Sequence, residues 1–223
     1  MPRQQYQDRL DELRDDVLYM SELVAERLRD GLTALEEKDD RLAEEVIQGD
    51  GEINRMYLEL ESDCIDLFAL QQPVAGDLRF IAASFKIITD LERIADLATN
   101  LGKYTKDAEN DVFPDVDVQR IGDAVLDMLE EAMLAYAEQD VETCYAVADR
   151  DDVVDDLCST ASETVVRDLI QRDQADEGET EALMTDISRL LLTIRDLERV
   201  GDHAVNIAAR TLYMVENDDE LLY

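Results

Sequence analysis

The sequence predicts an all-α protein built as two tandem, pseudo-symmetric three-helix bundles with six long helices. Glycine and proline are scarce, with 8 and 3 residues among 223, which leaves little turn chemistry and favours long helices over sheets. Apolar residues recur at three- and four-residue steps along most of the chain, as on one face of a helix. The motif Asp-Leu-Glu-Arg-(Ile/Val)-(Ala/Gly)-Asp occurs twice, at 90–96 and 196–202.

The first repeat is expected to contain three helices. The first ends before Lys38-Asp39-Asp40, where an aspartate can cap the following helix. The second ends before Pro73, because proline disfavours helical backbone in the preceding residue. Gly49 and Gly51 predict a kink or mild fraying within it, since each costs about 1 kcal/mol relative to alanine. The third begins at Asp77 as N-cap. The predicted spans are residues 5–37, a second helix ending near Gln71, and 77–107.

The same pattern then begins again. Residues 34–39 align with 135–140, and at this offset Val46, Asp50 and Asn54 fall on Val147, Asp151 and Asp155. A repeat of about 100 residues is too long for a solenoid unit and suits a duplicated three-helix bundle. The predicted helices span 118–138, 141–174 and 179–217. The predicted domains are 1–107 and 117–223, joined by a linker at 108–116.

The charge of the chain excludes several classes of partner. Acidic residues number 56 against 21 basic ones, for a net charge of −35. Such self-repulsion is tolerable when salt shortens the Debye length to roughly 3 Å near 1 M, so we interpret the excess as halophilic adaptation to a salt-loaded cytoplasm. Binding to nucleic acid or an anionic membrane is disfavoured. No signal peptide or spanning stretch is evident, and three dispersed cysteines (Cys64, Cys144 and Cys158) suit buried positions in a reducing compartment.

Four of the predicted helices carry polar pairs spaced four residues apart. At about 100° per residue, Glu92 falls in the apolar stripe of the third helix and Asp96 at its shoulder. Glu198 and Asp202 repeat this arrangement in the sixth helix. Folding each helical hairpin back on itself brings these pairs level with pairs on the preceding helix. The candidate metal ligands are Asp50, Asn54, Glu92 and Asp96 in the first repeat, and Asp151, Asp155, Glu198 and Asp202 in the second.

Three or four carboxylates beside a core need compensation for their charge. Arg93 and Arg199 directly follow the glutamates and therefore point about 100° away from them. Metal is thus the favoured interpretation, and all-oxygen ligands suit Mg, Mn, Ca or ferric iron. The alternative is a protonated or hydrated polar seam without metal. His203 is the single histidine and is predicted to lie at the surface, not among the ligands.

The sequence gives no reason to expect an enzyme. It lacks the Glu-x-x-His motifs of di-iron carboxylate proteins, a glycine-rich phosphate loop, a Ser/His/Asp set and a reactive cysteine site. A di-metal carboxylate enzyme is therefore the less favoured alternative.

The chain resembles the PhoU family of phosphate-signalling accessory proteins over nearly its whole length. The likeness rests on Gln71-Gln72-Pro73-Val74-Ala75-Gly76-Asp77-Leu78-Arg79, on the two Asp-Leu-Glu-Arg copies and on the tandem layout. It implies metal sites on the paired acidic motifs, with iron or zinc as the usual metals. Two positions depart from the family pattern. Asn54 stands where the motif has Asp, which predicts a weaker first site, and Ala95 replaces the glycine kept at Gly201.

The resemblance also implies a regulatory role. The leading hypothesis is a cytoplasmic, homodimeric negative regulator of phosphate uptake and of the phosphate-starvation response. It would act by contact with the ATPase of a phosphate ABC transporter and with a sensor histidine kinase. The alternative within the same class is an adaptor for a low-affinity phosphate permease.

Overall fold

The protein is almost entirely helical in the part that its structure describes. The computed structural model describes residues 3–70, 74–107, 116–171 and 177–222. Within these ranges there are six α-helices, one short 3-10 helix and no strand, so the all-α prediction is confirmed. The elements are α1 (Arg3–Glu37), α2 (Asp40–Leu70), α3 (Ala75–Lys106), α4 (Val118–Glu138), α5 (Val141–Gln171), α6 (Glu177–Glu216) and η1 (Glu220–Leu222).

The predicted helix boundaries are close to the observed ones, with two corrections. The predicted N-cap Asp77 is wrong: α3 begins at Ala75, with Val74 at the N-cap, and Asp77 lies in the first turn, where its charge favours the positive end of the helix dipole. The predicted fraying at Gly49 and Gly51 is also wrong, because α2 continues through both. The Gln71–Pro73 turn, the predicted end of the fifth helix at 172–174 and linker residues 108–115 lie outside the described ranges.

The break between the first two helices is confirmed at the level of hydrogen bonds. The Asp39 carboxylate accepts from the backbone N–H groups of Arg41 and Leu42, at 2.9 and 3.0 Å. Asp117 caps α4 in the same way, accepting from the backbone N–H of Arg120 at 3.0 Å. These contacts satisfy donors that the first turn of a helix leaves without an intrahelical partner.

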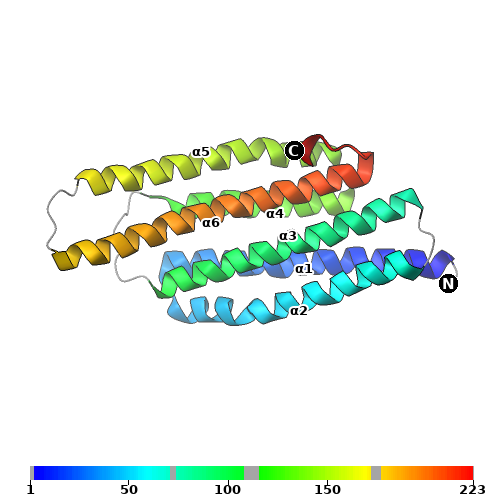
Figure 1. Cartoon of the computed structure of the whole chain (residues 1–223), viewed down its shortest axis with the longest axis horizontal. Coiled ribbons are helices and arrows are strands. Elements are labelled where there is room, and N and C mark those ends of the chain that lie inside the picture. Colours follow the sequence, from blue (N-terminus) through cyan, green and yellow to red (C-terminus); the bar gives the residue numbers. More distant parts are fainter. Residues whose placement is uncertain (1–2, 71–73, 108–115, 172–176, 223) are drawn as a thin grey trace.

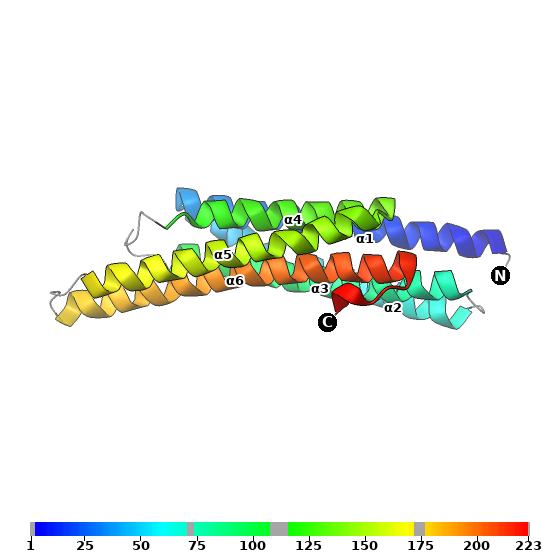
Figure 2. The ribbon, with the colours of Figure 1, turned by 90° about the horizontal axis from the view of Figure 1, so that it is seen from above.

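The six helices form two layers (Figures 1 and 2). In one layer α3 and α6 lie side by side in the middle, with α2 and α5 at the outer edges. Helices α1 and α4 form the other layer. Each repeat is a three-helix bundle, and the two are related by an approximate twofold axis that makes α3 antiparallel to α6 and α1 antiparallel to α4.

One hydrophobic core extends through both bundles. A single cluster of buried residues includes side chains from all six helices. At the junction of the repeats, the ring of Phe80 in α3 stacks on Tyr136 of α4 with centroids 6.2 Å apart. The Tyr136 hydroxyl and Ser84 Oγ share a hydrogen bond of 2.8 Å. The pairing of α3 with α6 and of α1 with α4 is therefore part of the core itself.

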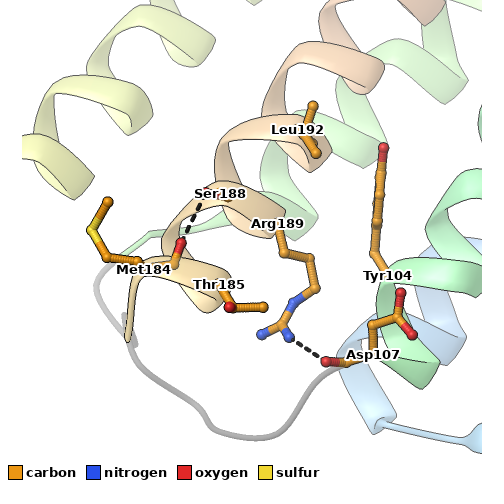
Figure 3. A pocket seen from close by; sticks show the side chains of 7 residues that line it. All are labelled: Tyr104, Asp107, Met184, Thr185, Ser188, Arg189 and Leu192. Atoms are coloured by element: carbon orange, nitrogen blue, oxygen red, sulfur yellow. Dashed lines mark hydrogen bonds between the residues drawn. The ribbon is translucent and has the colours of Figure 1, made fainter. Parts of the chain in front are cut away.

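Each bundle also provides an arginine that binds a backbone carbonyl at the C-terminal end of a helix in the other bundle. The guanidinium of Arg189 in α6 donates to the backbone carbonyl of Asp107, at the end of α3, over 2.8 Å (Figure 3). In the opposite direction, Arg79 of α3 donates to the carbonyl of Met214 near the end of α6 over 3.4 Å. A cation at a helix C-terminus satisfies a free carbonyl and opposes the negative end of the dipole.

Candidate metal centres

The eight predicted ligands lie along two seams between neighbouring helices. Asp50 and Asn54 come from α2, and Glu92 and Asp96 come from α3. In the second repeat, Asp151 and Asp155 come from α5, whereas Glu198 and Asp202 come from α6. The helical hairpins therefore bring each pair beside its predicted partner pair, and the carboxylates within each group interact electrostatically because they are close.

In the first seam, hydrogen bonds already occupy the central carboxylate. Asp50 accepts from Asn54 Nδ2 at 2.8 Å and from Thr99 Oγ1 at 3.4 Å. Burial raises the pKa of Glu92, and the charges of Asp96 and Asp50 add to this effect. Burial and the charge of Asp50 likewise raise the pKa of Asp96. Asn54 thus has a neutral amide where the motif has a carboxylate, and this amide donates a hydrogen bond to Asp50.

The second seam is more strongly charged and less well satisfied. Burial, followed by the charges of Asp155 and Asp202, raises the pKa of Asp151 to about 6. Asp151 Oδ1 is fully buried and has no hydrogen-bond partner. Burial and the charge of Asp155 also raise the pKa values of Glu198 and Asp202. A buried carboxylate oxygen without a partner is costly, and a cation is the ligand that would satisfy it.

The carboxylates lie further from the core than the sequence predicts. Glu92 is half-buried, but Glu198 and Asp202 are exposed, and so are Asp96 and Asp155. The predicted stripe was centred on Ile81, whereas α3 packs against α1, α2 and α6. Its buried arc is therefore centred near Leu91, about 80° away. This shift places the glutamates at the edge of the buried face.

The donor set fits a hard cation better in the second seam than in the first. Within the described residues, no group of three or more His, Cys, Asp or Glu side chains is arranged to hold an ion as it stands. Binding would require the exposed carboxylates of the second seam to turn toward Asp151, whose Oδ1 is available. Gly201 packs beside that oxygen, and a Cβ there would lie 3.5 Å from it, at ordinary contact distance. The assignment of the eight residues as metal ligands stays a prediction.

His203 is buried, so its predicted surface position is wrong. Its Nδ1 lies 2.8 Å from Oδ1 of Asp90 in α3, which is also buried. The prediction failed because it considered the hairpin between α5 and α6 alone, whereas His203 faces α3 in the other bundle. Aligning the repeats would have revealed this, since His203 corresponds to Leu97, a core residue.

The first aspartate of each repeated motif joins the two bundles. Asp90 meets His203, and its counterpart Asp196 in α6 is buried and accepts from α3. The donors are Asn100 Nδ2 at 3.1 Å and the Tyr104 hydroxyl at 2.8 Å. Burial and the hydrogen bond to Asp196 raise the pKa of Tyr104 to about 12. Sequence reasoning assigned no role to either aspartate, although the duplicated motif marks both.

The raised pKa values predict an unusual pH dependence for the metal-free protein. A carboxylate whose pKa is raised by folding holds its proton in the native state at a pH where the unfolded chain has released it, so folding is favoured as pH falls. For Asp151 this window lies between its ordinary pKa and about 6. Acidification from pH 7.5 to 5 with chelator present should stabilise the protein by on the order of 1 kcal/mol, after discounting for solvent screening.

Thermal unfolding across this pH range measures the effect. Asp151→Asn should reduce the dependence, whereas Asp149→Asn, on the exposed face of the same helix, should leave it unchanged. A melting temperature that falls steadily from pH 7.5 to 5 would contradict the prediction.

Comparison with known proteins identifies one family. The model of the PhoU domain matches residues 17–105 and again 118–211. The phosphate-specific transport system accessory protein PhoU homolog of Pseudomonas putida is 35% identical over 222 residues, covering 97% of this chain and 82% of that protein. The crystal structure of PhoU from Pseudomonas aeruginosa superposes with a TM-score of 0.86 at 31% identity, covering 96% of this chain and all of that one.

A second solved structure is equally similar in fold. It is the phosphate transport system regulatory protein PhoU from Streptococcus pneumoniae, with a TM-score of 0.86 at 25% identity, covering 96% of this chain and 98% of that one. Within the described part of the chain, no helix is both long enough and apolar enough to span a bilayer.

Proposed function

The chain belongs to the PhoU family, and from this premise we propose that it is a non-enzymatic negative regulator of phosphate uptake and of the phosphate-starvation response. It acts in the cytoplasm, as a homodimer, by contact with the ATPase of a phosphate ABC transporter and with a sensor histidine kinase. The match of the PhoU domain model to both repeats carries the proposal. The names of the relatives, a transport accessory protein and a transport regulatory protein, support the same role.

The proposal includes carboxylate-bound metal, with iron or zinc expected from the family and Mg or Mn also compatible with the oxygen donors. The second seam is the stronger candidate, because its carboxylates repel one another and one buried oxygen has no partner. A bound ion would offset this repulsion and connect α5 to α6. The first seam should bind more weakly, since Asp50 already accepts two hydrogen bonds. The second-seam ligands would be Asp151, Asp155, Glu198 and Asp202.

Deletion of the gene tests the regulatory role. In phosphate-replete medium, the deletion strain should take up phosphate faster than the parent and should express its starvation-response genes. Removing the phosphate ABC transporter as well should abolish the extra uptake. If the extra uptake instead depends on a low-affinity permease, the adaptor role replaces the proposed one, and unchanged uptake in the deletion strain contradicts both.

A further inference from the structure

A groove lies between α1 and α4, the two helices that form one layer of the fold (Figure 2). Its volume is about 570 Å³, and it is open to solvent along much of its length. Ala25 and Met133 lie buried at its base, and Leu134 is 52% exposed. The lining residues are Leu18, Ser21, Glu22, Ala25, Glu26 and Arg29 of α1, and Leu129, Glu130, Met133, Leu134 and Ala137 of α4.

The opposite end of the same helix pair provides an internal comparison. There the helices approach closely, and a Cβ on Gly122 would collide with the Leu32 side chain. Three apolar lining positions of the groove are polar at the equivalent positions of the closed end, and at a fourth a leucine stands where the groove has alanine. The pairs, groove residue first, are Leu18 and Gln119, Leu134 and Thr33, Ala137 and Glu36, and Ala25 and Leu126. The apolar groove is therefore not a requirement of helix packing in this fold.

The rim of the groove is acidic. Glu22 and Glu26 lie one turn apart on the exposed face of α1. Glu130 of α4 pairs with Arg29 across the groove at 2.6 Å, and both side chains of this pair are about half exposed. The rim thus carries three carboxylates and one guanidinium around the apolar part of the groove. A complementary ligand has an apolar centre and positive flanks.

We propose that the groove docks an amphipathic helix of a partner protein, with an apolar stripe flanked by lysine or arginine. The lining positions on α1 run from Leu18 to Arg29, about 16 Å or three helical turns. This length accommodates a helix with apolar anchors at i, i+3 or i+4, and i+7. The inference rests on the proposed function, because it supplies a surface for the protein–protein contact by which the chain would regulate uptake.

The apolar and charged parts of the groove should respond differently to salt. A synthetic peptide of about 14 residues, with leucines spaced by three and four residues and lysines on both sides of this stripe, serves as the probe. Leu134→Gln should weaken its binding about tenfold at both low and high salt. Glu22→Gln with Glu26→Gln should weaken binding mainly at low salt, since screening removes the contribution of exposed charges.

The repeat supplies a matched control for charge. Asp123→Asn with Asp127→Asn removes the same charge from the equivalent positions at the closed end, and it should leave peptide binding within about twofold of wild type. Equal weakening by the two double variants would overturn the proposal, because binding would then follow net charge alone. The proposal would also be overturned if Leu134→Gln bound the peptide with wild-type affinity. Self-association that Leu134→Gln abolishes would assign the groove to a second copy of the chain instead.

The same variants separate this inference from the regulatory role. Binding of the purified phosphate ABC transporter to wild type, but not to Leu134→Gln, supports both proposals. Equal binding of both the transporter and the sensor histidine kinase to wild type and Leu134→Gln overturns the groove and leaves the regulatory role intact. If the deletion strain shows unchanged uptake, the regulatory role fails, and the peptide measurement still decides whether the groove docks a helix of this chemistry.

Discussion

Replacing His203 with alanine is expected to lower the free energy of unfolding by about 2–3 kcal/mol, because it leaves a buried carboxylate without its hydrogen-bond partner. The group left behind is the Asp90 carboxylate, which is buried between α3 and α6. Chemical denaturation in about 1 M salt, which screens the acidic surface, measures the change. His203→Ala should also weaken the contact between the bundles, and amide exchange along α3 and α6 would detect this weakening.

A double-mutant cycle identifies the cause. Asp90→Leu combined with His203→Leu should be far less damaging than either single change, since replacing both partners by apolar groups is often nearly neutral. Tyr104→Phe is the comparison at the other interbundle contact, and it should cost only about 1 kcal/mol, because Asn100 still donates to Asp196. A loss below about 1 kcal/mol in His203→Ala, or additive effects in the cycle, would show that the pair is not coupled as proposed.

Saturating metal is expected to raise the melting temperature by about 5–10 °C, and Asp151→Asn should abolish most of this increase. At a free concentration of 100 times the dissociation constant, binding to the native state contributes about 2.7 kcal/mol, and a chain of this size gains about 2–4 °C for each kcal/mol. Without metal, the same variant should melt at or above the wild-type temperature near pH 7, since it removes a charge from a repulsive group.

Asp50→Asn is the matched control in the first seam, and it should retain most of the metal response. The measurement is the melting temperature of wild type and of each of the two variants, first with chelator and then with Zn, Mn, Mg or iron. Unchanged melting of wild type with every one of these metals would contradict the metal proposal. A full metal response in Asp151→Asn would instead show that binding occurs elsewhere.

The helices were predictable from sequence because their signals are local and repeated. The aspartate that caps α2 and the proline that follows this helix act through backbone chemistry, and the tandem motif indicates duplication from the sequence alone. Asp77 shows the limit of local rules. It has the chemistry of a cap, but Ala75 and Gly76 already belong to the helix, so the boundary is set by two residues with no distinctive signal.

For the candidate site, the neighbours of each side chain could be predicted, but its burial could not. Hairpin geometry correctly placed Asp151 beside Glu198 and Asp202, because short connections leave little choice of register. How deeply these side chains are buried depends on which other helices pack against the α5–α6 hairpin. This packing could not be derived from a single bundle. The same omission explains the failure at His203, whose partner Asp90 lies 113 residues away in the chain.

The reciprocal arginine contacts have a consequence for synthesis on the ribosome. Arg79 is made early, yet the carbonyl that it reaches belongs to Met214, 135 residues later in the chain. The first three helices can collapse as they emerge, but the surface of α3 that contacts α6 stays exposed to solvent until α6 has also left the exit tunnel. The two bundles therefore join in a late step of folding, and nascent chains that stop before α6 would present this surface of α3 to chaperones and proteases.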